Sequence, residues 1–208
     1  MSTNTEISNL AISFLGIGHE IQDLDTDRSQ EAAICRTWFD VALESTQSDF
    51  LWPFTTKYAS LQLIENAPMS EFADSFQEWQ YSYQYPSDCI SFRKILSGTR
   101  NDNRQSRIPF EIIASDTGMQ IYTDMQFAIG KYSKKVTENQ VFSPQFVIAL
   151  AMRLAGYVAP GITGGDPFKK GDTAMKMYQM EGSKAESNFI NQNQDEEVPD
   201  SEFIRARS

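Results

Sequence analysis

The sequence is poor in the residues that enzymes most often use for metal binding and acid–base chemistry. It contains one histidine, His19, and two cysteines, Cys35 and Cys89, which lie far apart and form no CxxC or Cys/His cluster. We therefore expect reduced thiols, no metal and no other cofactor. His19 stands between two loop residues without a motif that would supply a nucleophile or an orienting partner, so we interpret it as a loop histidine.

Long apolar runs and an excess of positive charge are also missing. No stretch long enough to cross a bilayer is apolar throughout, and the opening MSTNTEISNL lacks the basic and apolar regions of a signal peptide, so we expect neither a membrane span nor secretion. Lys and Arg number 18 against 28 Asp and Glu, which gives a formal net charge of −10. An acidic surface repels the phosphate backbone, and this argues against a nucleic-acid reader.

Two possible catalytic patterns are weak. The Gly-rich GITGGDPFKKG at 161–171 lacks the GxxxxGK[ST] spacing of a phosphate loop, so we interpret it as a turn between helices. The acid pairs Asp23/Asp25 and Glu196/Glu197 could act as the carboxylates of a glycosidase, but pairs arise by chance in a chain so rich in acids. We expect no enzymatic activity.

Hydrophobic spacing predicts helices at both ends of the chain. Residues 6–16 place apolar side chains three and four positions apart, and a second helix, capped by Asp27, runs to about Ser48. This second helix places Ile34, Trp38, Val41, Ala42 and Ser45 on one face. A third helix begins at Pro144 and is apolar through Val158, which is typical of either a central core helix or the seam of an oligomer. Residues 167–190 form a last, more polar helix.

Between these helices the apolar period changes to two, which predicts β-strands. Trp79, Tyr81, Tyr83 and Tyr85 alternate with polar residues. We interpret this stripe as an inter-subunit or sheet surface, packed on a helix or a neighbouring subunit; a platform for sugars or bases is the alternative. A turn at 86–88, a strand at 89–96, a polar hairpin loop at 97–107 and three short strands follow.

The stretch DFLWPFTTKYASL, at 49–61, lies where the helical and β patterns meet. We interpret Trp52, Pro53, Phe54 and Lys57 as a structural corner, because a helix end and a strand start that diverge need a bulky aromatic wedge. The predicted fold is therefore α+β. It is a bundle of about four helices (1–52 and 138–190) with an inserted small antiparallel β-sheet domain (53–137) and an extended acidic C-terminal tail (191–208).

A series of short stretches in a fixed order carries a resemblance to a known family. The series opens with the helix NLAISFLGI, the acidic loop LDTD and the pair Phe39-Asp40, and it ends with DSEFIRAR. Between these lie three sets: Trp52, Phe54, Thr56, Lys57, Ala59 and Leu61; Tyr83, Tyr85, Pro86, Asp88 and Cys89; and Phe142, Pro144, Phe146, Ala149, Leu150, Ala151, Arg153, Leu154 and Ala155. Together they resemble the tail tubular protein A family, the head-to-tail adaptors of short-tailed bacteriophages, although Pro53 stands where the family has Asn.

The resemblance implies a structural virion protein at the head–tail interface of a phage. Members of that family form dodecameric rings between the portal protein and the tail nozzle. The expected partners are therefore further copies of this chain, the portal protein, a nozzle of the tail tubular protein B type and the tail fibres. Double-stranded DNA would pass through the lumen without specific binding. The tail would clasp the portal, and we expect the contact residues to be Phe189, Ile190, Val198, Phe203, Ile204, Arg205 and Arg207. The alternatives are a peptidoglycan-cleaving tail protein and an oligomeric binding module outside any virion.

Overall fold

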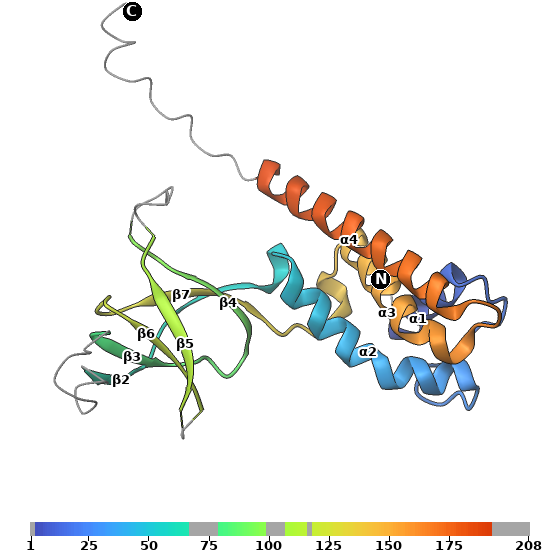
Figure 1. The fold of residues 1–208 in the computed structure, drawn as a ribbon, viewed down its shortest axis with the longest axis horizontal. Coiled ribbons are helices and arrows are strands. Elements are labelled where there is room, and N and C mark those ends of the chain that lie inside the picture. The colour runs from blue at the N-terminus through green and yellow to red at the C-terminus, as the bar shows by residue number, and fades with distance from the viewer. Residues whose placement is uncertain (1–2, 67–78, 99–106, 116–117, 193–208) are drawn as a thin grey trace, which may run out of the picture.

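The structure is a computed structural model that describes residues 3–66, 79–98, 107–115 and 118–192. These residues form four α-helices and two small antiparallel sheets, and the predicted α+β fold is confirmed. The helices lie together at one end of the molecule and the strands at the other (Figure 1). The predicted extended tail, 191–208, lies outside the described residues apart from the last turn of the final helix.

The helical layer is built around one central helix. Its members are α1 (Asn4–Phe14), α2 (Gln30–Asp49), α3 (Pro144–Ile162) and α4 (Pro167–Gln192). Helix α3 contacts each of the other three, and α2 and α4 flank it in Figure 1. Its small and branched apolar residues are buried on most sides, which explains why it combines the hydropathy of a membrane span with a place in a globular core.

The helix starts follow local capping signals, with one correction. Thr3 and Glu6 form a reciprocal capping box on α1, and Ser143 caps α3 with Pro144 in its first turn. The predicted cap of α2 at Asp27 is wrong, because the side chain of Ser29 accepts the N–H of Ala32 there. The carboxylate of Asp27 instead accepts N–H groups of the preceding loop and of Ser29, and these bonds lower its pKa.

The face of α2 that the spacing predicted is only partly covered: Ala42 is buried and Ile34 packs against the core. Trp38 and Val41 are 39% and 46% exposed. The buried residues of α2 are Ala32, Cys35, Phe39, Ala42, Leu43, Thr46 and Gln47. The helix thus carries two neighbouring apolar stripes, one with Ala32, Cys35 and Ala42 and one with Trp38 and Val41. Helix α3 covers the first stripe, because alanine and cysteine allow two helices to approach closely. Trp38 remains at the rim, where its ring lies 5.4 Å from that of Tyr157.

Seven strands form two sheets in the described part of the chain. The three-stranded sheet has the order β1 (Thr56–Ser60), β7 (Ile129–Lys134), β4 (Cys89–Ile95). The four-stranded sheet has the order β2 (Leu63–Asn66), β3 (Tyr81–Gln84), β6 (Gly118–Thr123), β5 (Phe110–Ser115). Every pairing is antiparallel.

The two sheets correct the predicted connection at 97–107. Strand β4 pairs with β7, and β5 pairs with β6, so 97–107 link one sheet to the other and do not close a hairpin. The turn at 86–88 is also a crossing between sheets, since β3 and β4 belong to different ones. Residues 99–106 of the loop lie outside the described part of the chain. Alternating apolar residues predict strands, but they do not say which strands pair.

Candidate interaction surfaces

The aromatic corner packs into the helical core. Trp52 is 3% exposed, and its indole N–H donates to the backbone carbonyl of Thr46 at 2.7 Å. The rings of Trp52 and Phe54 each lie 4.9 Å from that of Phe146 on α3, in edge-on geometry. Pro53 begins the short 3₁₀ turn that leads into β1. Since aromatic rings bury much area for each residue, this turn fixes the direction in which the chain leaves the helices.

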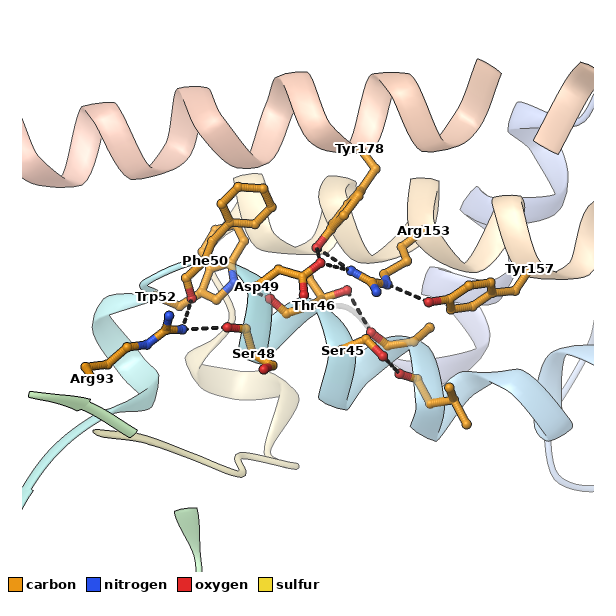
Figure 2. Close-up of polar contacts among 12 residues, drawn as sticks. Ser45, Thr46, Ser48, Asp49, Phe50, Trp52, Arg93, Arg153, Tyr157 and Tyr178 are labelled. Carbon is orange, nitrogen blue, oxygen red and sulfur yellow. Dashed lines mark hydrogen bonds and ion pairs between the residues drawn. The ribbon is translucent and has the colours of Figure 1, made fainter. Parts of the chain in front are cut away.

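Two polar side chains fasten the β region to the end of α2. Arg93 of β4 donates from Nη2 to the carbonyls of Ser48 and Phe50 at 2.6 and 3.2 Å (Figure 2). A guanidinium at the C-terminal end of a helix meets unpaired carbonyls and the negative end of the helix dipole. Gln47, fully buried, donates to the carbonyl of Val136 at 2.6 Å and accepts its N–H at 3.0 Å.

A second polar cluster joins three helices. Arg153 of α3 forms an ion pair with Asp49 and donates to the hydroxyls of Tyr157 and Tyr178, at 3.0 and 2.6 Å (Figure 2). Tyr178 donates to the same carboxylate at 2.9 Å. Burial raises the pKa of Tyr178 well above its ordinary value, so its hydroxyl stays protonated and serves as the donor. The cluster therefore fixes α2, α3 and α4 together.

Lys57 of the predicted corner lies in a contact of its own. Its Nζ is 2.7 Å from the carboxylate of Asp88, which also accepts the hydroxyl of Tyr132 at 2.8 Å. The hydrogen bond from Lys57 lowers the pKa of Asp88. The three residues come from β1, the 86–88 turn and β7, so the contact ties the edge of the three-stranded sheet to the crossing between sheets.

The predicted tyrosine stripe lies mainly inside the β region. Tyr83 is 1% exposed, and its hydroxyl donates to the carbonyl of Met125 at 2.8 Å. Tyr81 and Tyr85 are half-buried against the same core, and the half-buried Trp79 donates to Glu111 at 3.1 Å. Tyr83 therefore lies on a sheet face that packs within the β region, and strand alternation alone does not say what covers such a face.

Most of the predicted portal contacts cannot be placed. Phe189 is half-buried near the C-terminal end of α4, and Ile190 lies in the same helix. The others, Val198, Phe203, Ile204, Arg205 and Arg207, lie outside the described residues.

Two exposed apolar surfaces on the helical layer are additional to the predicted sites. The first is a hollow of about 510 Å³ between the end of α1, α3 and α4, lined by Phe14, Met152 and Met177 among others. The second is the uncovered stripe of α2 with Trp38 and Val41. The helical period predicted an apolar face on each helix, but which apolar residues stay exposed depends on tertiary packing.

Of the candidate catalytic residues, His19, Asp23 and Asp25 lie in the loop between α1 and α2, and Glu196 and Glu197 lie outside the described residues. His19 is exposed, and burial raises the pKa of the Cys35 thiol to about 11, which keeps it in its unreactive protonated form. In the Gly-rich turn, the carboxylate of Asp166 accepts the N–H of Lys169 at 3.1 Å at the start of α4. Within the described ranges, no group of three or more His, Cys, Asp or Glu residues is placed to hold a metal ion.

The functional evidence thus consists of contacts and surfaces within this chain. No protein-family model matches the sequence, and a comparison with curated proteins finds no significant match.

Proposed function

We propose that the chain is a structural virion protein, a head-to-tail adaptor that forms a dodecameric ring between the portal and the tail nozzle of a short-tailed phage. One observation carries the proposal. Segments that resemble the tail tubular protein A family, though far apart in the sequence, contact one another in pairs.

The first pair is aromatic. The corner segment contributes Phe54, and the Phe-x-Pro-x-Phe segment contributes Phe142 and Phe146. The ring of Phe54 lies 5.4 Å from that of Phe142 and 4.9 Å from that of Phe146. A match that arose by chance has no reason to fall on residues that pack together, so this contact supports a shared structural pattern.

The second pair is ionic. Lys57 comes from the corner segment and Asp88 from the Tyr-x-Tyr-Pro-x-Asp-Cys segment, and they form the 2.7 Å ion pair described above. Phe39, of the aromatic–Asp pair, is 5% exposed and belongs to the same helical core as Phe146. The resembling residues therefore hold the framework of the fold, which fits an assembly protein better than a catalyst.

A ring requires a heterologous contact, in which one patch of a subunit meets a different patch of the next. The hollow at Phe14 and Met177 and the stripe at Trp38 and Val41 are two such patches, and they lie on helices that flank α3. We propose that they face each other between subunits. The negative net charge suits a channel wall along which DNA slides, and the tail, from Phe189 to Arg207, would contact the portal.

The mass and shape of the purified full-length protein test the proposal. We expect a dodecamer, alone or on portal-bearing heads, by light scattering and electron microscopy. Val41→Glu and Met177→Glu should each prevent the ring, while Met119→Glu, an equally exposed position on β6, should leave it intact. A chain ending at residue 190 should stay folded but fail to join heads. A monomer under all these conditions, or clearing of peptidoglycan in a zymogram, contradicts the proposal.

A further inference from the structure

A hollow of about 430 Å³ beside β4 concentrates positive charge in an otherwise acidic chain. Among the residues that the structure describes, four basic ones line it: Arg93, Lys94, Arg107 and Lys131. Glu186 of α4 is the one acid among the described lining residues. The chain as a whole has a net charge of −10, so the sign of the charge here is opposite to that of the protein.

The hollow has an apolar wall as well as a basic rim. Leu51, Ile95, Ile108 and Phe110 are the described apolar residues of its lining. It lies at β4, an edge strand of the three-stranded sheet. Such a site fits a peptide that carries both acids and apolar side chains better than it fits a small inorganic anion.

Two of the basic residues direct their described contacts to neutral groups. Arg93 donates to the carbonyls of Ser48 and Phe50, and the ammonium of Lys131 lies 5.6 Å from the ring centre of Tyr58. These contacts orient the side chains but do not cancel their charge. The hollow therefore keeps an attraction for carboxylates from elsewhere.

The chain itself contains a segment of the matching chemistry. Residues 195–202, DEEVPDSE, hold five acids and no base, and Phe203 follows directly. Glu186, on the wall of the hollow, is six residues before the end of α4 at Gln192. Six helical residues span about 9 Å, and an extended chain adds about 3.3 Å for each further residue, so the segment can reach back. The short connection gives it a high effective concentration at the hollow.

We propose that this hollow binds the acidic segment 195–203 of the same chain. Its carboxylates pair with Arg107 and Lys131 beside Lys94, and Val198 and Phe203 contact the apolar wall. This interaction does not depend on the proposed role as an adaptor. Any partner that takes the C-terminal segment must compete with it.

Zero-length carbodiimide crosslinking of the full-length protein tests the contact directly. The reagent converts a carboxylate to an O-acylisourea, and a neighbouring lysine Nζ attacks its acyl carbon, so that the amide forms and the urea leaves. We expect amides that join Lys94 or Lys131 to acids of 195–202, mapped by mass spectrometry. In a mixture of isotopically light and heavy protein, these links should form within one copy. Links only between copies, or no links from these lysines to the segment, overturn the proposal.

Proteolysis of charge variants provides a second readout. A glutamyl endopeptidase cleaves after Glu196, Glu197 and Glu202, and we expect cleavage about three- to tenfold faster in Lys94→Gln/Lys131→Gln than in the parent protein. Lys134→Gln, on the same strand β7 as Lys131 but on its opposite face, is the matched control and should leave the rate unchanged. About 0.5 M salt should accelerate cleavage of the parent protein.

The same variants separate a peptide site from a nucleic-acid site. Equal cleavage rates in the double variant and the parent protein overturn the proposal. A short DNA duplex that binds the parent protein and not the double variant, without crosslinks to 195–202, also overturns it and assigns the hollow to phosphate groups.

Discussion

The helical layer and the β region are held together in different ways. The helical layer has one continuous core to which all four helices and Trp52 contribute. The fully buried apolar residues of the β region's own core, within the described ranges, are Leu61, Tyr83, Ile95, Ile121 and Ala128. The β region adds polar contacts to the helices through Gln47 and Arg93. We infer that the helical layer provides most of the stability and that the β region depends on its junction with it.

The largest effect is expected from Trp52→Ala. The change removes a buried indole and its hydrogen bond to Thr46, and it should lower the free energy of unfolding by about 3–5 kcal/mol. Tyr58→Ala, in the same stretch but 56% exposed, is the control and should change it by less than about 0.5 kcal/mol. Urea unfolding measures both. Equal free energies of unfolding for the two variants would refute the structural role of Trp52 between the helices and the β region.

A smaller and more local effect is expected from Gln47→Leu. The variant leaves the N–H and carbonyl of Val136 without their buried partners, at a cost of about 1–3 kcal/mol. Hydrogen exchange should accelerate in β7 and remain slow in α3, because the change breaks the junction and spares the helical core. Gln30→Leu removes an exposed hydrogen bond to Gly161 and is the matched control. Faster exchange throughout both regions would show that they unfold as one unit.

Two glycines in the helices test how tightly the helical layer is packed. A Cβ at Gly182 would lie 2.1 Å from the Phe50 ring, and one at Gly156 would lie 2.8 Å from the flexible side chain of Met175. Gly→Ala gains about 1 kcal/mol of helix propensity at either position. Overpacking costs about 1–3 kcal/mol at Gly182, so that variant should be less stable than Gly156→Ala, where the methionine can move. The reverse order in thermal unfolding would contradict the close contact at Phe50.

The sequence predicted the elements better than their partners. The strong helical period and Pro144 place α3 correctly, because both signals are local. The same local signals could not tell which apolar residues of α2 would be covered by α3, and Trp38 stays 39% exposed. They also treated 97–107 as a hairpin, since strand pairing depends on residues far along the chain. Of the candidate site residues, Trp52 could be predicted because it lies where the apolar spacing changes from helical to strand-like. The basic hollow could not be predicted, because its residues come from separate elements and form no pattern in the linear sequence.

The smallest effect is expected from Asp88→Asn, which tests a surface contact of the β region. Lys57 holds the pKa of Asp88 below its ordinary 3.8, so the carboxylate stabilises the fold above about pH 4 and loses this contribution as the pH falls through the lowered value. Asp88→Asn should therefore be slightly less stable than the parent protein at pH 7 and equally stable once the pH lies below the lowered pKa of Asp88. Lys57→Met completes a double-mutant cycle that isolates the pair from the hydroxyl of Tyr132. A stability difference between Asp88→Asn and the parent that persists unchanged as the pH falls through the lowered pKa would assign the effect to the geometry of the turn, because a protonated Asp88 carries no charge for Lys57 to attract.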